Sequence, residues 1–254
     1  MLSVAVIAKD AAQTLPECLN SAKNLSDDIV VVVDAATIDA TAQIAFDFGA
    51  KVYIREFDNF SAQKNFALSK CRYRWVLALD ADETVSSRLA AEIKTVLPGT
   101  KNAAFSIPRL NYIFCKPVYH TNWSPETDRH VWLFDKSRAR WSSQVHELVE
   151  VDGPVGRLNS PKTHINYQSV GQFISKMNQY TSLEVNSGKF SWTSYIIRPV
   201  WLRILFKPVW KFLRHYVLFM GFLDGWHGLF LSYLMAVYGL ALSVKAWEKT
   251  RHRF

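Results

Sequence analysis

The sharpest chemical signal in this sequence is a pair of carboxylates two residues apart, Asp80 and Asp82, at the end of an apolar run. The run 75–79 is typical of a buried strand, and ligands of open parallel sheets bind beyond the carboxyl ends of the strands. Two carboxylates at such an edge can hold a divalent cation that bridges a diphosphate. The alternative is that the two aspartates merely cap the helix that follows, and the pattern alone leaves both interpretations open.

Polar residues also follow two other predicted strands. Lys9 and Asp10 come after the apolar run 2–8, and Asp34 comes after the five β-branched residues 29–33. Because parallel strands end at a common edge, we expect these side chains to lie near the Asp80 turn.

The first hundred residues alternate strand and helix patterns, which predicts an α/β fold with a doubly wound, mostly parallel sheet. Thr14 and Glu17 have the spacing of a capping box, and Gly49 has the place of a helix-ending glycine. The remaining expected elements are strands at 2–8, 29–33, 51–54 and 74–79, and helices at 39–48, 61–71 and 86–97.

The rest of the chain has a looser pattern. Short β-like pieces occur at 103–107, 131–134, 146–151 and 163–167, a helical period returns over 170–188, and a basic, aromatic and largely helical region follows. We therefore expect one domain over 1–190, with halves 1–100 and 101–190, and a helical extension over 191–254.

Composition bounds the class of protein. The 254 residues carry a net charge of +8, with 49% apolar and 20% charged residues, which excludes a disordered or collagen-like chain. Three cysteines without a C-x-x-C pair exclude a disulfide scaffold and the common zinc-finger spacings, and favour a reducing compartment. The first apolar run is too short for a signal peptide.

Several segments resemble one known family. SVAVIAKDA, VVVDAATIDAT and FSAQKNFALSKCRYRWVLALDADE are similar to the nucleotide-sugar domain of family 2 glycosyltransferases, and most to the lipopolysaccharide-core β-1,4-glucosyltransferase branch. QVHELV, HINY and FLRHYVLFMGFLDGWHG extend the resemblance over nearly the whole chain. The sequence departs from the family pattern at Asp10-Ala11, Ala35 and Thr37. The resemblance implies the GT-A fold of nucleotide-diphospho-sugar transferases, with a basic, aromatic helical extension.

The resemblance also implies a role for each donor-side residue. Asp34 would hydrogen-bond the uracil ring, Asp80 would contact the donor ribose or the metal, and Asp82 would hold Mg²⁺ or Mn²⁺ on the diphosphate, which makes it catalytic. The other donor-binding residues would be Ala8, Lys9, Asp10 and Lys64. Without the resemblance, Lys64 would be interpreted as an exposed helix lysine.

A general base is needed to accept the proton of the attacking sugar hydroxyl. We predict Glu147, in the segment V-H-E, and the alternative for it is a loop salt bridge with Arg129, Arg138 or Arg140. The other acceptor-side candidates are His146, Asp128 and His164. His146 would orient the acceptor, and His164 would be either a further metal ligand or a structural histidine.

The C-terminal region differs in composition. Residues 198–254 carry nine basic and two acidic residues and 13 of the 35 aromatic residues, and 228–244 contain no charged group. Basic groups among large aromatics suit the headgroup layer of an anionic membrane. A stretch of 17 residues is at the lower limit for a span, so we expect an interfacial or re-entrant helix. The alternative is a helical pair packed on the catalytic domain.

The resulting expectation is an inverting, metal-dependent hexosyltransferase at the cytoplasmic face of the inner membrane. Its donor would be UDP-glucose and its acceptor a lipid-anchored saccharide such as the lipopolysaccharide inner core. A polyprenyl phosphate or another glycolipid is the alternative acceptor, and a non-catalytic nucleotide-sugar-binding module is a further possibility. A nucleic-acid-binding protein would explain the basic charge, but no helix-turn-helix, RNP or zinc pattern supports it.

Overall fold

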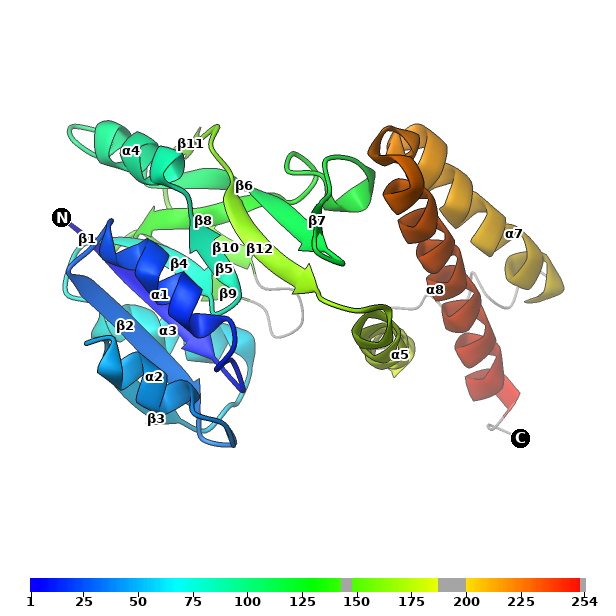
Figure 1. Ribbon diagram of the computed structural model, residues 1–254, viewed down its shortest axis with the longest axis horizontal. Coiled ribbons are helices and arrows are strands. Elements are labelled where there is room, and N and C mark those ends of the chain that lie inside the picture. The colour runs from blue at the N-terminus through cyan, green and yellow to red at the C-terminus, as the bar shows by residue number, and fades with distance from the viewer. Residues whose placement is uncertain (143–147, 187–199, 252–254) are drawn as a thin grey trace. The chain divides into compact units, whose positions relative to one another are not determined.

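The computed structural model describes residues 1–142, 148–186 and 200–251 (Figure 1). Its contacts form two compact units, which we call unit 1 (Met1–Leu110 and Pro125–Ile165) and unit 2 (Asn111–Ser124 and Asn166–Phe254). This division differs from the expected boundary at residue 190. The reason is that helix α5 (Val170–Asn186) packs against the C-terminal helix α8 (Gly225–Arg251) and so belongs with the extension.

Unit 1 is built on a mixed sheet that begins with four parallel strands. Their order is β3-β2-β1-β4, and the strands are β1 (Leu2–Ala8), β2 (Asp28–Asp34), β3 (Lys51–Arg55) and β4 (Trp75–Asp80). Antiparallel strands β8 (Arg129–Asp135) and β6 (Ala104–Ile113) continue the sheet beyond β4. The mostly parallel sheet expected from the sequence is confirmed for its first half.

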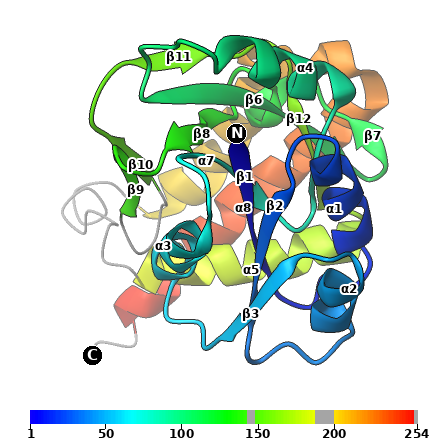
Figure 2. The same ribbon diagram turned by 90° about the vertical axis from the view of Figure 1, so that its left-hand side faces the viewer.

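Helices cover both faces of these parallel strands. Figure 2 shows α3 (Phe60–Lys70) on one side of β1–β3, and α1 (Leu15–Lys23) and α2 (Thr41–Asp47) on the other. Every residue of β2 is buried, as expected of a strand packed on both faces. The core under these helices is made by aliphatic residues such as Val4, Val31 and Leu77.

Local capping explains where the helices of unit 1 begin. Asn59 accepts a hydrogen bond from the Ala62 amide at the start of α3, and Ser86 accepts one from the Leu89 amide at the start of α4 (Ser87–Val96). The capping box predicted at Thr14 is wrong, because Thr14 makes no side-chain cap and has helical backbone angles. Gly49 ends α2 with a φ of +78°, which glycine adopts at little cost.

The remaining strands are short. The strands β5 (Glu83–Val85) and β12 (Lys162–Tyr167) pair antiparallel, and β9 (Ala139–Ser142) pairs with β10 (Leu148–Val151) in a separate two-stranded sheet. The strands β11 (Val155–Arg157) and β7 (Lys116–Pro117) pair with β6.

Unit 2 is mainly helical. In it α7 (Val200–Leu213) and α8 lie side by side, joined by a π-helical turn (Arg214–Leu218) and a 3₁₀ turn (Gly221–Asp224) (Figure 1). The uncharged stretch 228–244 lies within the one continuous helix α8. Segment Gly221–Lys249 is long and apolar enough to cross a membrane, judged by length and composition alone.

The segment F-L-D-G-W-H-G connects two parts of unit 2. The Asp224 carboxylate accepts hydrogen bonds from the His120 amide (3.0 Å) and lies 2.9 Å from His120 Nδ1. A Cβ on Gly228 would lie 1.8 Å from the Gly221 carbonyl oxygen, so only glycine fits there. Close backbone contact therefore accounts for Gly228, a φ of +63° accounts for Gly225, and the buried carboxylate bonded to His120 accounts for Asp224.

Candidate active site

Three predicted donor-side segments meet at one edge of the sheet. Strand β1 lies between β2 and β4, with Ala8 paired with Val33 and Ile7 paired with Asp80. Asp34 and Asp80 are the last residues of β2 and β4. The parallel arrangement therefore brings together side chains that are more than 40 residues apart in the chain, as the sequence predicts.

Asp34 is held in place by the loops around it. Its carboxylate is buried, accepts a hydrogen bond from the Ala36 amide (2.9 Å) and lies 3.0 Å from the Lys9 ammonium. The Ala36 amide and the Lys9 charge hold the pKa of Asp34 below its usual value. Asp34 is therefore a fixed anionic acceptor for a donor group such as an N–H.

The two loops next to Asp34 are linked to each other. Asp10 has a φ of +45° and accepts a hydrogen bond from the Ile38 amide. Asp39 accepts one from the Ala12 amide (2.9 Å), and hydrogen bonds from the Thr41 hydroxyl and the Ala12 amide hold the pKa of Asp39 below its usual value. These contacts define the shape of the loops where the sequence departs from the family pattern.

The acidic turn after β4 presents Asp80 and Asp82 without using either as a helix cap. Strand β5 follows the turn, and Ser86 caps the next helix. The side chains of Asp80 and Asp82 are 29% and 33% exposed, so both remain within reach of a ligand. His164 Nε2 lies 3.5 Å from the Asp82 carboxylate.

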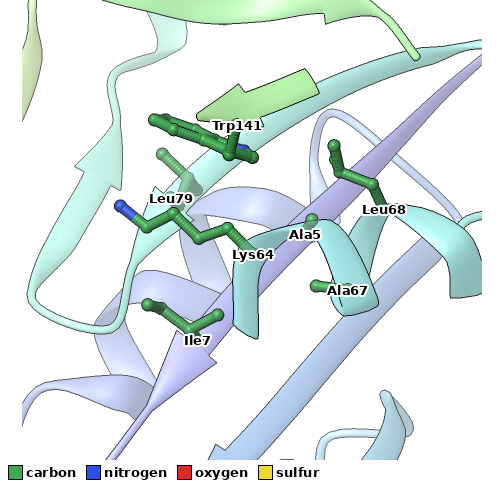
Figure 3. A pocket seen from close by; sticks show the side chains of 8 residues that line it. Ala5, Ile7, Lys64, Ala67, Leu68, Leu79 and Trp141 are labelled. Carbon is green, nitrogen blue, oxygen red and sulfur yellow. The ribbon is translucent and has the colours of Figure 1, made fainter. Parts of the chain in front are cut away.

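Lys64 extends from α3 to the same turn. Its ammonium lies 3.1 Å from the Asp80 carboxylate and 4.6 Å from the centre of the Trp141 ring. Figure 3 shows the side chain running along Trp141, with its nitrogen directed away from Ala67 and Leu68. The cavity beside it has a volume of about 10 Å³, roughly what one water molecule needs. Lys64 is thus a buried cation of the site and not an exposed helix lysine.

A buried carboxylate, Glu83, lies behind the turn. It contacts the Lys162 ammonium (2.5 Å) and Arg109 (3.2 Å), and it accepts a hydrogen bond from the Asp80 amide (2.9 Å). Arg109 also makes two hydrogen bonds to Asp128, at 2.8 and 3.0 Å. Lys162 Nζ lies 3.2 Å from the centre of the Trp132 ring.

This charge cluster shifts the proton affinities of its members. Burial favours the neutral form of Asp80, but the positive charges of Lys64, Lys162 and Arg109 outweigh burial and hold the pKa of Asp80 below its usual value. Burial lowers the pKa of Lys162 to about 8, against the opposing charge of Glu83. Asp80 therefore stays anionic at neutral pH.

Sequence reasoning did not select Arg109, Lys162 or Trp132. Lys162 comes just before the strand expected at 163–167 and two residues before His164, which is only a weak signal that both side chains share one face of β12. Their partners lie far away in the chain, Lys162 being 79 residues from Glu83, so no local pattern could identify them.

Two of the four acceptor-side candidates, Asp128 and His164, lie within the described residues. His146 and Glu147 lie outside the described residues, and the base role of Glu147 stays a prediction. Asp128 is 8% exposed, with both carboxylate oxygens bound by Arg109 and His130 Nε2 3.2 Å away. His164 lies beside Asp82, on the donor side of the site.

The acidic turn fits a magnesium-type cation better than an all-protein metal cage. No group of three or more His, Cys, Asp or Glu side chains within the described ranges could hold a metal. Mg²⁺ usually binds through one or two carboxylates and completes its shell with substrate phosphates and water. Asp82 and Asp80 fit such a site, with part of the Asp80 charge already neutralised by Lys64.

A mixed sheet with an acidic turn at the carboxyl end of its fourth strand is the GT-A architecture of nucleotide-sugar transferases. The sequence profile of glycosyl transferase family 2 matches residues 3–137, more than half of the chain. The chain belongs to this family and is a glycosyltransferase.

Relatives and solved structures agree with this assignment. An uncharacterized glycosyltransferase of Rickettsia typhi is 28% identical over 252 residues, covering 92% of this chain and 82% of the relative. The lipopolysaccharide core biosynthesis glycosyltransferase LpsC of Rhizobium meliloti is 26% identical over 263 residues, covering 98% of this chain and 92% of LpsC. Residues 1–349 of TarS of S. aureus, in complex with UDP, have a TM-score of 0.50 at 13% identity, over 98% of this chain and 91% of the TarS fragment. At that identity the likeness to TarS concerns the fold.

Proposed function

We propose that this chain is an inverting, metal-dependent hexosyltransferase that transfers glucose from UDP-glucose to a lipid-anchored saccharide such as the lipopolysaccharide inner core. The observation that carries the proposal is the edge at which Asp34 and the partly exposed Asp80 and Asp82 converge, beside the buried cation Lys64. The similarity to LpsC supports the choice of acceptor.

The donor site divides into a base-binding part and a diphosphate-binding part. Asp34 would accept a hydrogen bond from the uracil N–H, because its carboxylate is fixed and anionic. Asp82 and Asp80 would hold Mg²⁺ or Mn²⁺, which supplies Lewis-acid stabilisation of the leaving diphosphate when bound. Lys64 would add a fixed positive charge on the same side.

The acceptor hydroxyl would attack the anomeric carbon as UDP leaves, and the configuration at that carbon would invert. Glu147 would accept the hydroxyl proton, since Asp128 has both carboxylate oxygens bound to Arg109. The oriented carboxylate of a general base must come within about 2.6–3.2 Å of the hydroxyl oxygen in the complex.

The membrane part of the proposal rests on exposed apolar side chains in unit 2. Helix α8 exposes Trp226, Phe230, Tyr233, Val237, Leu240 and Val244 at alternating intervals of four and three residues, a continuous stripe on one face. Exposed apolar patches of this extent are rare on monomeric soluble proteins. Together with the net charge of +7 over residues 198–254, the stripe favours peripheral contact with an anionic leaflet at the cytoplasmic face of the inner membrane.

Two binding measurements test the donor assignment. Calorimetric titration of the full chain with UDP-glucose and with UDP-GlcNAc, each with and without Mn²⁺, should show Mn²⁺-dependent binding with a preference for UDP-glucose. UDP-GlcNAc is the second candidate because TarS, which shares the fold, is known in complex with it. Absence of binding to either sugar nucleotide in the presence of Mn²⁺ would refute the proposed donor class.

A further inference from the structure

Lys162 and Glu83 form an ion pair that cannot touch a substrate. Both side chains are fully buried, and their charged atoms lie 2.5 Å apart. Removing two charges from water costs several kcal/mol per ion, and their attraction often only offsets that cost. The pair therefore calls for an explanation other than the stability of unit 1.

The Glu83 carboxylate supports the acidic turn from the inside. The oxygen that contacts Lys162 also accepts the hydrogen bond from the Asp80 amide at 2.9 Å. The other oxygen contacts Arg109 at 3.2 Å. The side chain of Glu83 thus closes the turn whose two other carboxylates, Asp80 and Asp82, remain 29% and 33% exposed.

Strand β12 supports the same turn with its backbone. His164 pairs with Glu83 across β12 and β5, and the Ile165 amide donates a hydrogen bond to the Asp82 carbonyl oxygen at 3.0 Å. Lys162 and His164 are two residues apart on this strand, so both point to the face that carries the acidic turn. Lys162 is also fixed against Trp132, 3.2 Å from the ring centre.

We propose that Lys162 is a positioning residue of the donor site, which acts on Asp80 and Asp82 through the Glu83 carboxylate. The inference rests on the proposed function, because it assigns to these two aspartates the binding of the cation and diphosphate. Without the ammonium, the Glu83 carboxylate would shift toward Arg109 and release the Asp80 amide. The two exposed carboxylates would then lose their common orientation.

The Lys162→Met variant tests this through the factor by which Mn²⁺ strengthens UDP binding, measured by calorimetry on the full chain. We expect that factor to fall by about 10–100-fold, the usual loss when a residue supporting metal ligands is removed. UDP affinity without Mn²⁺ should stay within about twofold, since Asp34 is untouched. Lys162→Arg keeps the charge and should restore most of the Mn²⁺ effect.

Lys51→Met is the matched control. It removes another cation paired with a buried carboxylate of unit 1, since Lys51 Nζ lies 2.6 Å from Asp28. This pair lies at the first residues of β2 and β3, the opposite ends of the strands from Asp34. Lys51→Met should therefore keep the Mn²⁺ effect. A folded Lys162→Met protein that keeps it as well would overturn the proposal.

A second variant guards against loss of folding. If Lys162→Met does not fold, the double variant Lys162→Met/Glu83→Gln leaves no buried charge of this pair and takes its place. Loss of the Mn²⁺ effect in the double variant supports the proposal, and a Mn²⁺ effect equal to that of the unchanged protein overturns it.

A measurement without ligand separates this proposal from the proposed function. If the unchanged protein binds no UDP, or binds it without a Mn²⁺ effect, the proposed donor or its metal dependence fails. Hydrogen exchange of the Asp80 amide then decides on Lys162. Faster exchange in Lys162→Met (or in the double variant, should Lys162→Met not fold) that returns to normal in Lys162→Arg supports a positioning role, and unchanged exchange overturns it.

Discussion

Units 1 and 2 differ in which side chains they bury and which they expose. Unit 1 buries Glu83 and Lys162 completely, and it packs its aliphatic side chains inside a two-faced sheet. Unit 2 has small apolar clusters, such as Phe173, Met177 and Met235, and it exposes large side chains such as Trp226, which is 75% exposed.

The difference shows which surroundings each unit suits. In unit 1, buried and paired charges would position the groups proposed to meet the anionic donor, because electrostatic interactions are stronger away from water. Moving exposed aromatic and aliphatic side chains from water to a lipid surface or a partner lowers the free energy. The two units should therefore respond to different substitutions.

The largest expected effect is that of Asp82→Ala in unit 1. Loss of a cation ligand removes several kcal/mol of transition-state stabilisation, so transfer should fall by more than about a thousandfold. Vesicle binding should not change. The measurement is the transfer rate with Mn²⁺, and Asp47→Ala, at an exposed carboxylate of α2, is the control. More than about a tenth of the activity remaining in Asp82→Ala would contradict the assigned role.

Glu147→Gln should lower turnover by about 10²–10⁴, the usual contribution of a general base. The amide cannot accept the hydroxyl proton, whereas donor binding should remain, because the predicted donor contacts are made by other residues. Steady-state kinetics with separate kcat and KM values checks this. Full activity would move the base role to another carboxylate.

In unit 2, Trp226→Glu combined with Phe230→Glu should reduce binding to anionic vesicles by more than about a hundredfold. Burying each of these side chains in the lipid surface contributes about 1.5–3 kcal/mol of favourable transfer free energy. A change of about 1.4 kcal/mol corresponds to a tenfold change in affinity. Vesicle flotation measures the change, and UDP binding should be unaffected. Phe46→Glu, at a 70% exposed position of unit 1, is the control. Equal flotation of all three proteins would remove the membrane assignment from α8.

Asp34→Ala should raise the KM for the donor by about tenfold, the equivalent of one hydrogen bond to a charged group. The rate at saturating donor should change less, because the contact is the same in the ground and transition states. Initial rates over a range of donor concentrations distinguish the two parameters. An unchanged KM would exclude Asp34 from the nucleotide contact.

The smallest effect concerns stability and pH. Burial raises the pKa of Asp28, but hydrogen bonds from Lys51, Ser3 and the Arg72 amide outweigh it, so its pKa lies below the usual value. A carboxyl group with a depressed pKa in the folded state stabilises the fold at pH values above its unfolded pKa of about 3.9. This stabilisation is lost as the pH falls through the folded pKa. Asp28→Asn should therefore flatten the acid limb of the stability curve, measured by urea unfolding from pH 5 to pH 2. An acid limb as steep as before would show that Asp28 is not its cause.

Local sequence was sufficient for most of unit 1. The apolar runs at 2–8 and 29–33 specify strands β1 and β2 to within a residue, because buried parallel strands need uninterrupted aliphatic side chains. Since parallel strands end at a common edge, the proximity of Asp34 and Asp80 could be predicted from the sequence alone. The capping box at Thr14 failed because the spacing of two residues does not determine the backbone angles of the cap.

Only the tertiary structure decided what lies behind the acidic turn. The Lys162 ammonium reaches Glu83 across 79 residues, and its pairing depends on β12 lying beside β5. The same holds for Lys64. Its sequence context predicts a surface lysine in a short helix, but in the structure its ammonium is buried against Trp141 and Asp80. Periodicity reports which side of one element is apolar, whereas burial of a charge depends on which elements meet, and that is a property of the whole fold.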